Sequence, residues 1–461
     1  MRRLAAGDEI GGFRLAEKFH DGGLGTLWIV TRPDIAAPLV MKLPYLLPGD
    51  DALGIVSYET ELMIHPRLSG RHVPRFVAGG DFEGPYLVME RIHGSSLKDF
   101  LPKLPLPPAE VADLGARVAD ALEDLHRQRV VHLDIKPSNI TIRDDGGEAV
   151  LLDFGLSRHL DLPDLVGEEI DGPIGTGVYV SPEQVLLRRN DPRSDLFALG
   201  VLLYFFATGT RPYGEPRTAG QWRKRLTTEP VPPRLLRPDL PKWLQEIILH
   251  CLAIDPAERY QSAAHLAFDL RHPDLVRLTE RAERTGAGRT LTALKRWFGL
   301  TRARVAIAPE PAAALPQGPS IIMAAVDLDA EQESLARALS ATVERLAAGE
   351  PGARIACVNV LKLARLMLDR TEDAEGRNLH LLRLAQLEHW AAPLNRLPNT
   401  ITYHVIEAID PAAAIIEFAQ RNHVQHLAMG ARSASVLRRY LGSVSAKVVA
   451  EAPCTVTVVR A

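Results

Sequence analysis

The sequence predicts a multidomain protein whose first part is α+β and whose second part is α/β. Three observations lead to this prediction. Strand-like runs interrupted by glycines fill residues 8–90, and an amphipathic helix then leads into a polar loop at residues 131–139. From Ser320 onward, strands alternate with helices, which is typical of a doubly wound parallel sheet.

Composition narrows the possible functions. The chain has 461 residues, enough for two or three domains, and its 54 Lys and Arg nearly balance 57 Asp and Glu. This balance gives no reason to expect a nucleic-acid partner. The start lacks a signal peptide and no apolar run is long enough to span a bilayer, so we expect a cytoplasmic protein with no transmembrane segment. Three widely spaced cysteines are expected to be buried, reduced thiols: Cys251, Cys357 and Cys454.

The first strands bracket a glycine turn that contains Gly22 and Gly25. Backbone amides in such a turn can approach phosphates closely, although an ordinary glycine hairpin explains the turn better when it is taken alone. An apolar strand at Leu39–Leu43 then carries Lys42 near its end. A lone lysine in this position is usually a solvated charge at the rim of a sheet.

The polar loop combines an acid, a base and an amide within six residues. Asp134 could accept a proton from a hydroxyl, Lys136 could neutralise a transferring phosphoryl group, and Asn139 could hold a metal ion. Pro137 in the middle favours a rigid loop over a helix. A buried strand at 149–152 follows, ending at Asp153-Phe154-Gly155.

Together, the loop at 132–139 and Asp153-Phe154-Gly155 resemble the catalytic motifs of the eukaryotic-like (Hanks-type) protein kinases of bacteria. Lys136, two residues after Asp134, resembles the serine/threonine branch. The resemblance covers residues 8–272 and implies a bilobal α+β protein-kinase fold. The small lobe would span about 8–90 and the large lobe about 94–272.

The resemblance also implies ATP and Mg²⁺ as cofactors. Lys42 would contact the α- and β-phosphates and pair with Glu61 on the next helix, with Glu59 as the alternative partner. The resemblance implies the following roles for the other residues: Gly22 and Gly25 would contact the phosphates, backbone groups of Glu90 and Ile92 would bind adenine, Asp134 and Lys136 would act in catalysis, and Asn139 and Asp153 would bind magnesium.

Scaffold contacts are implied as well. Thr176 would hydrogen-bond near Asp134 and Lys136 rather than serve as a regulatory phosphorylation site. Asp195 would accept backbone amides of the catalytic loop. Glu183 would form a buried ion pair with Arg259.

Two positions depart from the family pattern. His20 replaces the first glycine of the glycine-rich loop, and Leu133 replaces an arginine that usually pairs with a phosphate on the activation loop. Leucine cannot form that charge-assisted pair. We therefore hypothesise that loop phosphorylation is not required for activity.

Residues 273–318 differ in composition from their surroundings and are predicted to form a linker. Basic and apolar residues interleave over 289–304, and prolines with alanines follow. The pattern predicts a basic amphipathic helix that packs on the kinase lobe or, as the alternative, lies on an anionic membrane or a partner. The Pro/Ala stretch predicts a spacer.

Residues 319–461 resemble the universal stress protein family through Ala324-Ala325-Val326-Asp327, the segment at 429–433 and the segment at 442–445. Some members of that family bind ATP, which would place Asp327, Gly430, Gly442 and Ser443 at a second nucleotide site. The alternative is a sheet domain that mediates dimerisation or sensing. The resemblance also implies a homodimer through Thr455–Val459.

The combined prediction is an ATP-dependent kinase that phosphorylates serine and threonine hydroxyls of protein substrates and is coupled to a stress-sensing domain. The alternative is a pseudokinase, a nucleotide-binding scaffold in stress signalling, which His20 and Leu133 favour. The enzyme is favoured by four intact residues: Lys42, Asp134, Asn139 and Asp153.

Overall fold

The structure is a computed structural model in which the chain separates into two compact units. The first unit contains most of the residues before 310, and the second unit contains those that follow together with two short earlier segments, 44–55 and 80–86. The structure describes residues 4–22, 25–45, 52–82, 84–170, 172–216, 218–285, 320–328, 333–350, 352–362, 378–396, 400–431 and 443–460. The linker helix and spacer predicted within 286–318, and Gly442, therefore lie outside the described residues.

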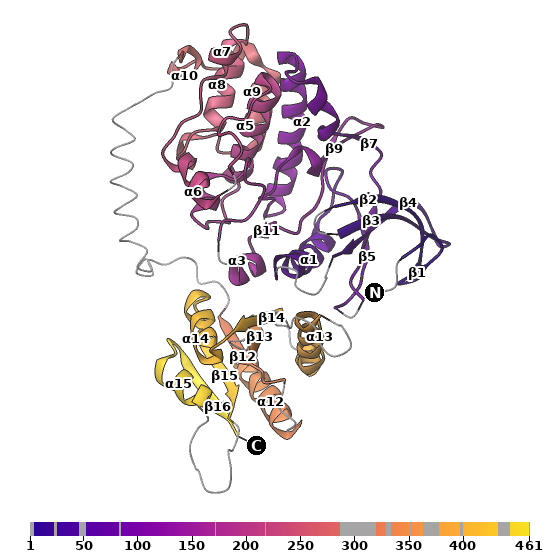
Figure 1. Ribbon diagram of the computed structural model, residues 1–461, viewed down its shortest axis with the longest axis vertical. Helices are drawn as coiled ribbons and strands as arrows, with labels where there is room; N and C mark the ends of the chain where they lie inside the picture. Colours follow the sequence, from indigo (N-terminus) through magenta and orange to yellow (C-terminus); the bar gives the residue numbers. More distant parts are fainter. Residues whose placement is uncertain are drawn as a thin grey trace. The chain divides into compact units, whose positions relative to one another are not determined.

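The first unit begins with a six-stranded sheet in the order β1-β2-β3-β4-β6-β5 (Figure 1). In β2, Phe13 and Leu15 are buried while Arg14 is exposed, because alternate residues of a strand face opposite sides of the sheet. Helix α1 (Ala52–Ile64) packs on the sheet through Tyr58. The strands are β1 (Glu9–Ile10), β2 (Phe13–Asp21), β3 (Gly25–Arg32), β4 (Ile35–Pro44), β5 (Phe76–Gly79) and β6 (Leu87–Glu90).

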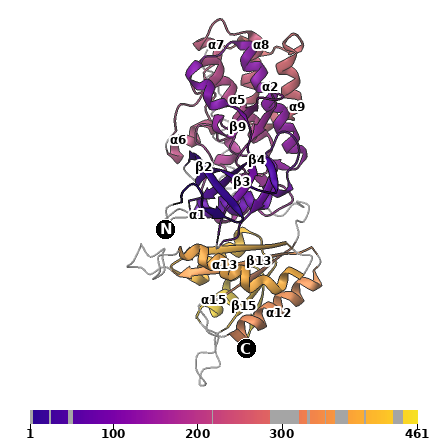
Figure 2. The same cartoon turned by 90° about the vertical axis from the view of Figure 1, so that its right-hand side faces the viewer.

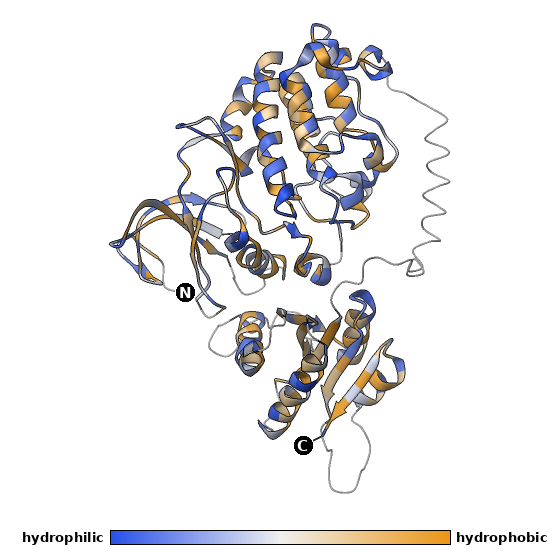
Figure 3. Ribbon diagram, turned by 180° about the vertical axis from the view of Figure 1, so that it is seen from behind, coloured by the Kyte–Doolittle hydropathy of each residue, from blue (hydrophilic) through white to orange (hydrophobic). Residues whose placement is uncertain are grey.

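A helical lobe follows in the same unit, built on helices α2, α5, α8 and α9 (Figure 1). Helix α2 (Pro108–Arg127) buries one apolar face, as its residue spacing predicts. Helix α5 (Arg193–Thr208) is buried along almost its whole length and ends at Gly209, whose left-handed φ of 74° suits a glycine cap. In Figure 3, apolar and polar residues alternate along the helices of this lobe. The other two are α8 (Lys242–Cys251) and α9 (Ala263–Arg271).

Shorter elements complete the first unit and flank the polar loop at 132–139. They are η1 (His65–Arg67), β7 (Gly94–Ser96), η2 (Leu97–Lys103), β8 (Val130–Val131), η3 (Pro137–Asn139), β9 (Ile140–Arg143), β10 (Ala149–Leu151), β11 (Arg158–His159), α3 (Leu165–Glu169), α4 (Pro182–Val185), α6 (Ala219–Trp222), η4 (Arg223–Leu226), α7 (Pro233–Leu236), η5 (Pro256–Glu258), η6 (Pro273–Leu275) and α10 (Glu280–Glu283).

The second unit contains a five-stranded sheet in the order β14-β13-β12-β15-β16, and every pair of neighbours is parallel. Strand order reverses at β12, which is where ligands bind in doubly wound sheets. The elements are β12 (Ile321–Ala325), α12 (Glu333–Gly349), β13 (Arg354–Lys362), α13 (Leu379–Ala391), η7 (Ala392–Arg396), β14 (Thr400–Ala408), α14 (Pro411–Arg421), β15 (His426–Gly430), α15 (Ser443–Glu451) and β16 (Thr455–Val459).

Helices cover both faces of this sheet. Apolar residues of α12 and α13 pack on one face, and those of α14 and α15 pack on the other. Figure 2 shows α12, α13 and α15 beside strands β13 and β15. The predicted α/β fold is confirmed, and β16 matches its predicted bounds.

No described helix has the length and apolar character needed to cross a bilayer. All three cysteines carry free thiols, and Cys251 and Cys357 are buried as expected. Cys454 differs because it is only partly buried, immediately before edge strand β16.

Candidate active site

The polar loop at 132–139 is held by one buried carboxylate. Asp195, at the start of α5, accepts the backbone amides of His132 and Leu133, each at 2.8 Å. It also bonds Nε2 of His126, at the end of α2, at 2.9 Å. Asp195 has no exposed surface, so three donors compensate for its burial. The predicted anchoring of the loop by Asp195 is confirmed.

Asp134 lies at the centre of this loop and is 5% exposed. One carboxylate oxygen accepts the Thr176 hydroxyl at 2.7 Å, and the other accepts the Lys136 ammonium at 2.6 Å. Asn139 Nδ2 donates to the second oxygen at 3.1 Å and to the Asp134 carbonyl at 3.0 Å. The predicted contacts of Thr176 with Asp134 and Lys136 are therefore present.

A second cluster joins the sheet, α1 and the segment that follows β10. Lys42 Nζ lies 2.6 Å from Glu61 Oε2 and 2.9 Å from Asp153 Oδ1. Burial alone would lower the pKa of Lys42, but the carboxylates of Asp153 and Glu61 outweigh burial and raise it above its ordinary value. Burial alone would raise the pKa of Asp153, but Lys42 holds it well below its ordinary value. Lys42 and Asp153 are therefore both ionised at neutral pH.

The structure pairs Lys42 with Glu61, the preferred candidate, and not with Glu59. The Lys42–Asp153 contact also links the sheet to the loop: Leu152, the residue before Asp153, donates its amide to the Asn139 carbonyl at 2.8 Å. Both clusters therefore belong to one site.

Two residues of the site have left-handed backbone conformations that side chains rarely adopt. Leu133 has a φ of 64° and Asp153 a φ of 66°. Such conformations cost about 1–3 kcal/mol each and occur often at functional sites. Each lies in a segment fixed by the contacts described above, which is how the fold retains them.

Phe154, the residue after Asp153, belongs to a row of contacting aromatic rings that was not predicted from the sequence. Phe154 contacts His132 and His65, with ring centroids 5.4 and 5.3 Å apart, and His65 also contacts Phe76 at 5.8 Å. His65 Nε2 lies 2.7 Å from the Pro74 carbonyl. The only available signal was that His65 lies one helical turn after Glu61.

The glycine turn lies between β2 and β3, and the connector follows β6. Gly22 donates its amide to the Gly25 carbonyl at 3.0 Å, closing the turn between β2 and β3. The amide of Glu90 already donates to the Arg75 carbonyl at 2.9 Å. Any adenine contact at Glu90 therefore falls to its carbonyl, while Ile92 lies two residues further along the connector.

The donor atoms suit magnesium. Asn139 uses its Nδ2 for Asp134, and its Oδ1 accepts a long 3.3 Å hydrogen bond from Ser138 Oγ. An amide oxygen has two lone pairs, so one is left for a cation. Asp153 supplies a carboxylate. Magnesium prefers such hard oxygen ligands and is commonly held by one or two protein groups together with phosphates. Among the described residues there is no larger cluster of acidic, His or Cys side chains that could hold a metal.

An ion pair fixes the far end of the segment that follows Asp153. Both guanidinium arms of Arg259 bind Glu183, at 2.7 and 2.8 Å, and both side chains are almost completely buried. Ser194 donates a further hydrogen bond to Glu183 at 2.6 Å. The predicted buried pair is confirmed.

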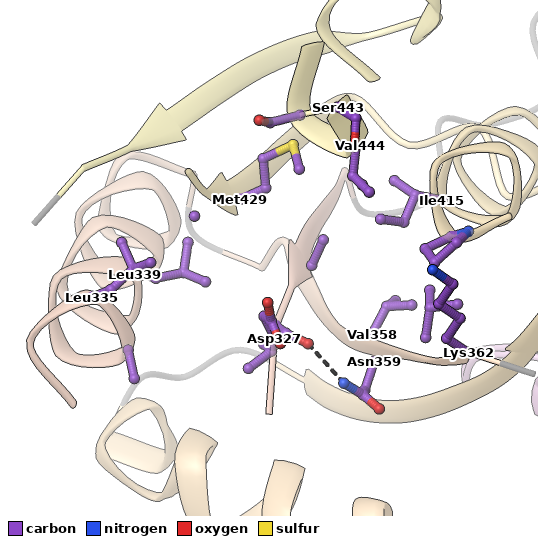
Figure 4. Close-up of a pocket in the computed structure, with 17 residues that line it drawn as sticks. Asp327, Leu335, Leu339, Val358, Asn359, Lys362, Ile415, Met429, Ser443 and Val444 are labelled. Carbon is purple, nitrogen blue, oxygen red and sulfur yellow. Dashed lines mark hydrogen bonds between the residues drawn. The ribbon is translucent and has the colours of Figure 1, made fainter. Parts of the chain in front are cut away.

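In the second unit, a cavity of about 470 Å³ lies at the carboxyl ends of β12, β13 and β15 (Figure 4). Asp327, Lys362 and Ser443 supply its polar lining, and aliphatic side chains of Met429 and Ile415 face the same space. Asn359 also lines the cavity, and its side-chain amide donates a 2.9 Å hydrogen bond to the Val326 carbonyl.

The cavity lining includes Gly430. A side chain there would approach Leu335 of α12 to 3.0 Å, so close packing explains this glycine. Three of the four residues predicted for a second nucleotide site therefore line one cavity: Asp327, Gly430 and Ser443.

The first unit thus has the fold and the constellation of a protein kinase domain, and the second has a doubly wound parallel α/β fold. Comparison with known families agrees. Residues 55–270 match the protein kinase domain family, and residues 320–460 match the universal stress protein family. The chain is a Hanks-type kinase domain followed by a universal stress protein domain.

Several bacterial kinases are similar to this chain. The chain is 31% identical over 255 residues to serine/threonine-protein kinase PknL of Mycobacterium tuberculosis, covering 55% of this chain and 63% of PknL. It is 30% identical over 282 residues to kinase pkn3 of Myxococcus xanthus, covering 58% and 50%. It is 38% identical over 192 residues to the probable serine/threonine-protein kinase CE0033 of Corynebacterium efficiens. This match covers 40% of this chain and 29% of CE0033. The chain therefore spans less than two thirds of the length of these relatives.

Proposed function

We propose that this protein is an ATP-dependent kinase that transfers the γ-phosphate of ATP to serine or threonine hydroxyls of a protein substrate. The observation that carries the proposal is the Lys42–Asp153 contact at 2.9 Å, next to a loop that presents Asp134 and Lys136. The relatives' names support the same reaction. We expect the protein to meet ATP and its substrate in the cytoplasm.

Each residue has a role that follows from its position. Lys42, fixed by two carboxylates, would hold the α- and β-phosphates, and Asn139 and Asp153 would hold Mg²⁺, which neutralises phosphate charge when bound. Asp134 already accepts a hydroxyl from Thr176 at 2.7 Å, so it can orient a substrate hydroxyl and take its proton. Lys136 would place positive charge beside that hydroxyl.

The test measures phosphate transfer from labelled ATP with magnesium. Asp134→Asn and Lys42→Ala are each expected to lower the rate about 100-fold or more, because each removes one group that stabilises the transition state. Asp145→Asn is the matched control, since Asp145 is exposed in the turn before β10. Equal incorporation by wild type and both site variants would reject the enzyme and favour the nucleotide-binding scaffold.

We also propose that the second unit binds a nucleotide and couples its binding to the kinase. The support is the cavity at the strand-order reversal, which combines Asp327, Lys362 and Ser443 with an apolar wall that suits a base. Calorimetry on the full chain with ATP and with AMP is the test. Wild type should show one binding event more than Asp327→Ala, and identical isotherms at millimolar nucleotide would contradict the second site.

A homodimer through β16 is proposed on narrower support. β16 is an edge strand of the second sheet, and Thr455 at its start is exposed. Edge strands present unpaired backbone groups that a second copy can pair with. Sedimentation should show a concentration-dependent dimer that Thr455→Lys weakens; a monomer at all concentrations would contradict it.

A further inference from the structure

The activation segment, residues 153–183, contains few hydroxyl groups, and none of them is an open phosphorylation site. Ser157 is 1% exposed and donates to the His132 carbonyl at 3.1 Å. Thr176 is bound to Asp134. The other two hydroxyls are at most 5% exposed: Tyr179 and Ser181.

The catalytic loop also lacks a receptor for a phosphate at the position next to Asp134. Leu133 is apolar and 4% exposed. Only its carbonyl serves the segment, accepting Gln184 Nε2 at 2.9 Å. If the segment is held in a defined position, an internal contact must hold it.

Arg189, six residues after Glu183, provides such a contact. Its Nε lies 3.1 Å from both carboxylate oxygens of Asp164, and its NH2 donates to the Leu156 carbonyl at 3.0 Å. The Arg189 side chain is only 8% exposed and that of Asp164 22%, so water screens this pair less than a surface pair. Arg158 is a more distant neighbour of Asp164, at 3.9 Å.

These contacts connect two distant points of the segment to a residue just beyond its end. Leu156 directly follows Asp153-Phe154-Gly155, Asp164 caps α3 by accepting the Gly167 amide at 3.2 Å, and Arg189 follows α4. One guanidinium therefore joins the start and the middle of the activation segment to the chain that follows the segment. The Arg189 side chain thus bridges separate parts of the chain without a phosphate group.

We infer that the Arg189–Asp164 ion pair holds the activation segment in its substrate-accepting position and replaces phosphorylation in this role. The inference rests on the proposed kinase function. Arg189 is a positioning residue: it acts through Asp164 and Leu156 on the segment that brings Thr176 to Asp134.

The test uses the full chain and compares Arg189→Gln and Asp164→Asn with Arg188→Gln. Arg188 is the matched control because it is adjacent, exposed and without an ion pair in the part of the chain that the structure describes. We expect Arg189→Gln and Asp164→Asn to raise KM for the protein substrate about tenfold or more while KM for ATP changes less than threefold. Arg189→Lys should recover part of the loss, and phosphatase treatment of wild type should change nothing.

Amide hydrogen exchange of residues 156–170 supplies a readout that is independent of activity. Faster exchange in Arg189→Gln than in wild type and Arg188→Gln is expected, and it decides the inference even if wild type transfers no phosphate. The double variant Asp164→Arg with Arg189→Asp should restore slow exchange, which separates loss of the pair from misfolding. Unchanged exchange and KM in Arg189→Gln, or loss of wild-type activity on phosphatase treatment, would overturn the inference.

Discussion

Replacing Glu61 by glutamine tests the charge arrangement around Lys42 most directly. The Glu61 side chain is 1% exposed and its Oε2 lies 2.6 Å from Lys42 Nζ. Glutamine keeps the size of the side chain but removes the charge that fixes the ammonium between α1 and Asp153. Breaking a buried ion pair costs about 3–5 kcal/mol when nothing else compensates. Asp153 remains 2.9 Å away and compensates in part.

We therefore expect Glu61→Gln to cost about 2–3 kcal/mol of transition-state stabilisation, reduced from the full cost of a broken buried pair. This corresponds to a loss in kcat/KM of about 30- to 150-fold. The assay is magnesium-dependent phosphate transfer, with thermal unfolding measured in parallel. Glu59→Gln is the control, because Glu59 lies on the same helix and is also buried. It should lose less than about threefold, within the range of small mutational effects.

Two results would refute this reasoning. Full activity in Glu61→Gln would show that Asp153 alone positions Lys42. Equal losses in Glu61→Gln and Glu59→Gln would show that the helix, and not the ion pair, is what both substitutions disturb.

Three further predictions concern stability and thiol chemistry. Glu183→Gln should lower the free energy of unfolding by about 3–5 kcal/mol in denaturant titrations, because it leaves Arg259 buried without its anion; a change below 1 kcal/mol would contradict this. Burial lowers the pKa of His65, so the unfolded chain takes up its proton first and stability should fall as pH drops below about 6.5; His65→Leu should flatten that fall, and an unchanged pH profile would exclude His65. Burial raises the pKa of the Cys357 thiol to about 12, so a thiol reagent at pH 8 should label Cys454 well before Cys357 in the native protein.

Much of the fold follows from local pattern. Strand and helix periodicity predicts the order of elements in both units, since each buries one face or one run of residues. The resemblance to the protein kinase family implies that Asp195 holds the catalytic loop and that Glu183 pairs with Arg259, and the structure contains both contacts.

Other features depend on packing between distant segments and have no local signal. The ring of His65 contacts Phe154 only because the end of α1 meets the segment after β10. Arg189 meets Asp164 across 25 residues, and nothing in either neighbourhood marks the pair. The left-handed φ of Leu133 is likewise imposed by its surroundings, because leucine does not favour it.

The anchoring of the catalytic loop by Asp195 has a consequence for synthesis. The two residues whose amides donate to Asp195 precede it by 63 and 62 positions, so a nascent chain that ends before α5 leaves the amides of His132 and Leu133 without their acceptor. Contacts over such separations form late, because closing a long loop costs entropy before the contact repays it. A growing polypeptide therefore carries the residues of the catalytic loop before the carboxylate that anchors this loop has been synthesised.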